Sequence, residues 1–111
     1  MEIQETKHDN TFVLTLVGDF LSEIDQSTLQ EKVRVLNAQG CKYVILDLAA
    51  VHYMNSCGLG SLVAILTTMR KGGGDLKLVR VNANIMGLLT LTRLTKVFRI
   101  CDTLSAAFES Y

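Results

Sequence analysis

The feature that most constrains the fold of this chain is a regular alternation of strand-like and helix-like segments from residue 11 onward. The continuous apolar run at residues 43–46 is typical of a strand covered on both faces. Residues 56–71 instead repeat apolar side chains at the spacing of a helix. Because right-handed crossovers connect such units, the alternation predicts a mostly parallel sheet. We therefore expect one α/β domain over residues 1–111.

The expected elements include a first strand that joins the sheet as an edge, which gives about five strands with helices mainly on one face. A capping-box pattern at Ser27 and Gln30 places the start of the first helix near Asp25 or Ser27, and Gly40 ends that helix. The full set of expected elements is strands at 2–8 and 11–17, a helix up to 40, a strand at 43–46, a loop at 49–55, a helix up to 71, a strand at 76–79, a helix at 83–91, a strand at 97–100 and a helix at 103–108.

The second helix is expected to present one apolar face to the core. The side chains assigned to that face are Leu59, Leu62, Val63, Leu66 and Met69. The opposite face, turned outward, would then carry Ser61, Ala64 and Thr68.

Composition excludes several classes of function. Eleven basic residues balance eleven acidic ones, so the net charge is zero and no electrostatic footprint for nucleic acid is expected. No apolar run approaches the roughly 20 residues of a bilayer span, and the first residues do not resemble a signal peptide. The three cysteines are widely spaced and odd in number. We expect a cytoplasmic protein without membrane insertion.

The sequence offers little support for an enzyme. His8 and His52 have no partner at a recurring metal-binding spacing. Ser56, His52 and Asp47 supply the residue types of a catalytic triad, but the G-x-S-x-G elbow of the hydrolases is missing. Gly58 and Gly60 form only half of a dinucleotide fingerprint, and glycines 72–74 suit a helix end. We therefore predict no catalytic, cofactor-binding or metal-binding residues.

The segment at residues 53–60 is the candidate site, because it leads from a buried strand into a helix N-terminus. Asn55 and Ser56 are both favoured N-cap residue types. A helix N-terminus favours negative charge, so a phosphate carried on Ser56 would be tolerated there. The alternative interpretation is a plain capping loop without further function.

Two segments of the chain resemble a known family: VILDL at residues 44–48 and MNSCGLG at residues 54–60. They are similar to the signature of the STAS domains, an apolar strand ending in D-L or N-L and then a loop carrying M-D-S-x-G-L-G. Residues 18–25 and 76–98 also resemble the family in order, with extra residues between Gly18-Asp19 and Ile24-Asp25, so the likeness covers nearly the whole chain. The family includes the bacterial anti-sigma factor antagonists of sporulation and general stress pathways.

The resemblance implies a phosphorylation cycle centred on Ser56. The unphosphorylated antagonist would bind an anti-sigma factor that is itself a serine kinase, and so free a sigma factor. That kinase would phosphorylate Ser56, and a serine phosphatase would reset the protein. Asn55 stands where the family usually has aspartate, which keeps the capping capacity but removes a negative charge. Cys57 is a size-conserving departure.

The partner surface is expected around the candidate site. It comprises the loop residues His52, Tyr53, Met54, Asn55, Ser56 and Cys57, together with the outward helix residues Ser61, Ala64 and Thr68. A different role within the same family stays open, either as an accessory subunit of a lipid or anion transport system or as a binder of a nucleotide or another small ligand. Genes for a kinase-like anti-sigma factor nearby would favour the first interpretation, and transporter genes the second.

Overall fold

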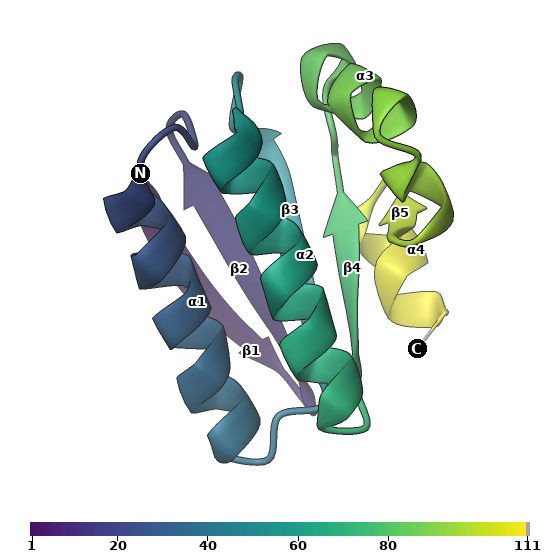
Figure 1. Cartoon of the computed structure of the whole chain (residues 1–111). Helices are drawn as coiled ribbons and strands as arrows, with labels where there is room; N and C mark the ends of the chain where they lie inside the picture. Colours follow the sequence, from purple (N-terminus) through teal and green to yellow (C-terminus); the bar gives the residue numbers. More distant parts are fainter. Residues whose placement is uncertain (111) are drawn as a thin grey trace.

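The computed structural model describes residues 1–110, in which five strands form one mixed sheet in the order β1-β2-β3-β4-β5 (Figure 1). β1 pairs with β2 in the antiparallel sense, and all other neighbours are parallel. The strands are β1 (Glu2–His8), β2 (Thr11–Val17), β3 (Tyr43–Ala50), β4 (Asp75–Val79) and β5 (Arg99–Cys101). The predicted α/β class and mixed, mostly parallel sheet are confirmed.

The long helices lie together on one face of the sheet, as predicted (Figure 1). A short helix, α4, contacts β3, β4 and β5 from the opposite face. Within the described residues the helices are α1 (Glu23–Ala38), α2 (Ser56–Lys71), α3 (Ala83–Leu91) and α4 (Leu104–Glu109), with a 3₁₀ turn η1 (Leu94–Lys96). In the same part of the chain, no helix combines the length and the apolarity that crossing a bilayer would require.

The main core lies between the sheet and the two long helices. Because side chains alternate across a strand, Leu46 and Leu48 of β3 enter this core, whereas Ile45 faces α4. The other fully buried members from strands and helices include Leu14, Leu16, Leu76, Leu78, Leu29, Val33, Leu62 and Met69. This packing fixes α2 against the sheet along its whole length.

Three element boundaries differ from the sequence prediction by two residues or more, and β4, α4 and the end of β5 are displaced by a single residue. α1 begins at Glu23, earlier than predicted, because Ser22 is its N-cap and accepts a hydrogen bond from the Asp25 amide at 3.1 Å. β3 continues to Ala50, since its pairing with β2 extends beyond the apolar run. The last strand starts at Arg99, because the turn η1 occupies the preceding residues. The second and third helices and the first two strands lie where predicted.

Candidate functional site

Ser56 is the first residue of α2 and is exposed to solvent. It lies at the end of the sheet where the parallel strands finish, the upper end of the molecule in Figure 1. The predicted position of this serine at a helix N-terminus is confirmed. A side chain at the first helical position projects next to the unpaired amides of the first turn, which favour a negative group.

Asn55 is the N-cap of α2, with an extended backbone at φ −108° and ψ −167°. Its Oδ1 accepts hydrogen bonds from the amides of Cys57 at 3.0 Å and Gly58 at 3.3 Å. These bonds satisfy two of the amides that a helix start leaves without partners. The first turn of α2 contains no acidic residue. Its positive end is therefore not neutralised by a carboxylate within the helix.

The loop before Ser56 is tied to the segment that enters α1. Phe20 and Met54 form an isolated parallel bridge. The Phe20 amide donates to the Tyr53 carbonyl at 3.0 Å, and the Asn55 amide donates to the Phe20 carbonyl at 3.3 Å. A Cβ on Gly58 would lie 2.8 Å from the Phe20 carbonyl oxygen, so only glycine allows this close approach. These contacts hold the turn that carries Ser56 in a fixed position relative to the core.

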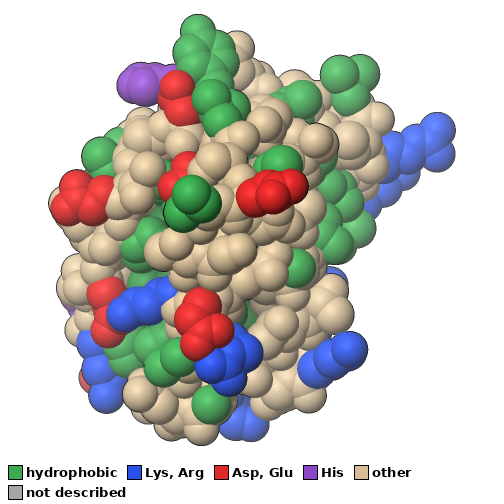
Figure 2. Space-filling view, turned by 60° about the vertical axis from the view of Figure 1, so that its left-hand side comes forward, with side chains coloured by type: hydrophobic (Ala, Val, Ile, Leu, Met, Phe, Trp, Pro, Cys, Tyr) green, Lys and Arg blue, Asp and Glu red, His purple; other side chains and the backbone are tan. Residues whose placement is uncertain are grey.

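An apolar rim borders the serine on the α1 side. Phe20 and Met54 are buried, so the alternation of the bridged segments turns Leu21 and Tyr53 outward. Leu21 is 47% exposed, Tyr53 is 59% exposed, and Ile24 on the first turn of α1 is 79% exposed. Figure 2 shows hydrophobic side chains reaching the surface at this upper end. Of this rim the sequence indicated only Tyr53. Leu21 and Ile24 were missed, because they come from a distant segment that only the fold brings beside Tyr53.

The structure divides the predicted loop residues by exposure. His52, Tyr53, Asn55 and Ser56 are exposed and Cys57 is half-buried, as a partner surface requires. Met54 is 6% exposed and belongs to the core, so its side chain is not part of the surface. This position is an anchor that holds the loop in place.

The predicted faces of α2 are wrong at Ser61 and Val63. Ser61 is fully buried, and Ala64 and Thr68 are half-buried where α2 packs beside α1. Val63, assigned to the core, is instead 36% exposed. The core stripe is centred on Gly58, Leu62, Ile65 and Met69. Because α2 packs against both the sheet and α1, its buried arc is wider than a single stripe and includes Ser61.

A catalytic arrangement of Ser56, His52 and Asp47 does not form. Asp47 is buried and accepts hydrogen bonds from the Arg80 guanidinium and, at 3.1 Å, from the Ala49 amide. This carboxylate also raises the pKa of Arg80, chiefly through their hydrogen bond. Asp47 therefore serves a structural ion pair at the sheet end. Among residues 1–110, no three metal-ligating side chains lie close enough to hold an ion.

The chain matches the STAS domain family over residues 2–107. It belongs to the STAS domain family. Two relatives are the anti-sigma F factor antagonist of Paenibacillus polymyxa and the anti-sigma-B factor antagonist of Bacillus subtilis. The first is 22% identical over 102 residues, which cover 92% of this chain and 87% of the relative. The second is 28% identical over 100 residues, which cover 90% of each chain.

Solved structures agree with this STAS fold. A crystal structure from Thermotoga maritima, provisionally assigned to the anti-sigma factor antagonists, has a TM-score of 0.91 at 27% identity and covers 97% of this chain and 92% of its own. The Bacillus cell fate determinant SpoIIAA, solved in its phosphorylated form, has a TM-score of 0.77 at 16% identity, with 98% of both chains covered. The second likeness concerns the fold alone.

Proposed function

We propose that this STAS domain is an anti-sigma factor antagonist whose binding is switched by phosphorylation of Ser56. The observation that carries the proposal is the exposed Ser56 side chain at the start of α2. It occurs in a chain whose relatives are named anti-sigma factor antagonists. The partner would be an anti-sigma factor with serine kinase activity, and its capture would free a sigma factor. This role belongs in the bacterial cytoplasm and requires no catalysis by the chain itself.

The surroundings of Ser56 suit both states of such a switch. In the unphosphorylated state the serine is neutral and lies beside the apolar rim of Leu21, Ile24 and Tyr53. A phosphate would add about −1.5 to −2 charges. In the free protein that charge meets the unneutralised start of α2, which tolerates it. In a complex it would be buried against an apolar contact, where an unpaired charge is costly. Phosphorylation therefore favours release, and a serine phosphatase would restore binding.

The proposed partner surface follows the exposed side chains. It consists of His52, Tyr53, Asn55, Ser56 and Cys57, extended over Leu21 and Ile24. Ala64 and Thr68 contribute only where they line a shallow hollow between α2 and α1. Ser61 is excluded from this surface by its burial.

The test is incubation with a candidate anti-sigma kinase and ATP, followed by intact-mass measurement. We expect one added phosphate in the wild type and none in Ser56→Ala, because the acceptor hydroxyl is lost. Ser56→Ala should bind the anti-sigma factor as tightly as the wild type, whereas Ser56→Asp should bind at least about tenfold more weakly. Equal affinity of all three proteins would contradict the switch and leave Ser56 a helix-start residue. If no kinase modifies the wild type, the transport-accessory or ligand-binding role becomes the better interpretation.

A further inference from the structure

Two asparagines at the candidate site share one arrangement of hydrogen bonds. Asn55 caps α2 through Oδ1, and its Nδ2 donates to the Leu21 carbonyl at 2.9 Å. Asn82 caps α3 by accepting from the Ile85 amide at 2.9 Å. Its Nδ2 donates to the carbonyls of Val51 at 2.8 Å and His52 at 3.2 Å. Each side chain thus caps its own helix with the oxygen and holds a neighbouring segment with the nitrogen.

The orientation of both amides is fixed by their partners. Every contact of Oδ1 is a backbone N–H, and every contact of Nδ2 is a backbone carbonyl. If either side-chain amide were flipped, its NH2 group would face backbone N–H donors and its oxygen would face backbone carbonyl oxygens. Capping the helix and donating to a neighbouring carbonyl therefore together require an amide. An ionised carboxylate caps equally well but has no hydrogen to donate.

Together the two side chains connect three helix starts at the same end of the sheet (Figure 1). Asn82 joins the start of α3 to the loop that precedes Ser56. Asn55 then joins the start of α2 to Leu21, whose next residue, Ser22, is the N-cap of α1. The Ser56 turn is consequently held from the α1 side and from the α3 side. Sequence analysis missed Asn82, although an asparagine just before a predicted helix is itself a capping signal.

We infer that Asn55 and Asn82 form an amide brace that positions the Ser56 turn for recognition by its protein partner. The inference rests on the proposed function and names two positioning residues for that site. The brace fixes Leu21 and the 51–53 loop relative to Ser56, so that the apolar rim and the hydroxyl are presented as one preformed surface. When the rim and the hydroxyl are already held in place, less conformational entropy is lost as a partner binds to both of them.

The brace also changes what an aspartate at position 55 would do. From the resemblance to the family, restoring the aspartate through Asn55→Asp is expected to speed the phosphorylation of Ser56 and to leave the folded domain nearly unchanged. In the structure the substitution keeps the cap on Cys57 and Gly58 but removes the donor to Leu21. It also places a carboxylate oxygen against the Leu21 carbonyl. Asn82→Asp makes the same chemical change at α3, where the carbonyls of Val51 and His52 lose their donor.

The first experiment measures amide hydrogen exchange in the isolated protein. In Asn55→Asp we expect the amides of Phe20 and Asp25 to exchange about fivefold faster, as the loss of one ordinary hydrogen bond predicts. The amides of Cys57 and Gly58 should stay protected, because the carboxylate still caps them. In Asn82→Asp the faster amides should be those of Val51 and Tyr53. Unchanged exchange at these positions in both variants would overturn the brace.

The second experiment uses the anti-sigma kinase identified by the phosphorylation test. Both variants should raise the KM for phosphorylation of Ser56 about fivefold. The matched control is Thr103→Ala, which removes the cap of α4 on the far face of the sheet and should leave KM unchanged. An unchanged KM in both asparagine variants, or an equal rise in Thr103→Ala, would overturn the positioning role. If the wild type is not phosphorylated at all, the proposed function fails and the exchange experiment alone decides whether the brace exists.

Discussion

The two faces of the sheet are stabilised by different means. The face under α1 and α2 is packed almost wholly with apolar side chains. The face under α4 has only a small apolar cluster of Val13, Ile45, Val79 and Ala107. It also carries the buried charges of Asp47 and Lys77. Two sixteen-residue helices cover the first face, whereas a six-residue helix covers part of the second.

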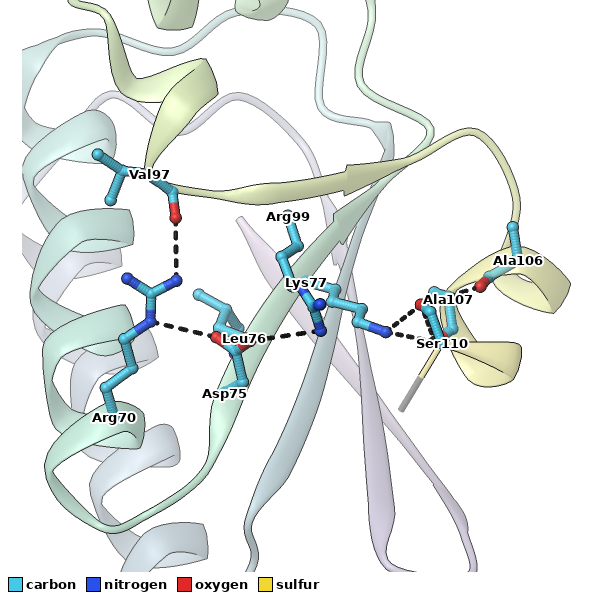
Figure 3. Close-up of polar contacts among 9 residues, drawn as sticks. All are labelled: Arg70, Asp75, Leu76, Lys77, Val97, Arg99, Ala106, Ala107 and Ser110. Carbon is cyan, nitrogen blue, oxygen red and sulfur yellow. Dashed lines mark hydrogen bonds and ion pairs between the residues drawn. The ribbon is translucent and has the colours of Figure 1, made fainter.

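Directional polar contacts replace apolar area on the α4 face. Lys77 Nζ donates to the Ala107 carbonyl at 2.9 Å and to the Ser110 hydroxyl at the end of α4 (Figure 3). A cation near a helix C-terminus is favourable, because the last carbonyls lack partners. Burial nevertheless lowers the pKa of Lys77, chiefly by desolvation. The short helix α4 is thus held in place by a few hydrogen bonds, whereas the long helices α1 and α2 are held by the packing of a large apolar surface. The Ser56 site lies at the edge of the apolar face, which supplies its rigid support.

The largest effect is expected from opening a cavity on the apolar face. Leu62→Ala should lower the free energy of unfolding by about 3 kcal/mol, because Leu62 is fully buried between α2 and the sheet. Urea unfolding measures the loss. The matched control is Val63→Ala on the exposed side of the same helix, which should change stability by less than about 0.5 kcal/mol. Equal losses in the two variants would mean that the buried arc of α2 is assigned wrongly.

On the α4 face, Lys77→Ala should cost about 2 kcal/mol of unfolding free energy, since it removes packing and leaves the end of α4 without its donor. The loss should be concentrated in α4, whose amides should lose hydrogen-exchange protection while those of α2 keep theirs. Lys96→Ala, at an exposed position, is the control and should have little effect. Equal destabilisation of α2 and α4 would erase the proposed contrast between the faces.

A smaller effect of opposite sign is expected at Ser61. Its buried hydroxyl has no hydrogen-bond partner among the described residues. Ser61→Ala should therefore raise the free energy of unfolding by about 1 kcal/mol, because the desolvated hydroxyl is removed without creating a large cavity. Thermal melts compare it with Ser27→Ala, an exposed position on α1 that should be nearly neutral. A loss of stability in Ser61→Ala would show that the hydroxyl is satisfied in solution.

The smallest effect is a pH dependence specific to the α4 face. Because the folded pKa of Lys77 is lowered from 10.5, the unfolded chain holds its proton over a pH range in which the folded chain has released it. The contribution of Lys77 to stability should therefore rise with pH between the lowered pKa and 10.5. Unfolding measured across this alkaline range in the wild type and in Lys77→Met should show a steeper rise in the wild type. Parallel curves would remove Lys77 as the titrating group.

The sequence by itself determined the order of the elements and the position of the candidate serine. Apolar runs, glycine stops and capping residues act over a few neighbours, so they located β1, β2, α2 and α3 without knowledge of the fold. The same local signals placed Ser56 at a helix start. The start of α1 was missed, because Ser22 and Ser27 both satisfy local capping rules. In the structure Ser22 is the N-cap, and Phe20, two residues earlier, is buried in the core.

Tertiary structure alone decided which side chains around Ser56 are available. Ser61 and Val63 exchange their predicted environments, because burial depends on how α1 and the sheet together surround α2 and not on the periodicity of α2 alone. The rim of Leu21 and Tyr53 likewise exists only because two segments more than thirty residues apart pair through Phe20 and Met54. Contacts between distant segments leave no local pattern in a single sequence, so the fold has to bring them together before the surface can be recognised.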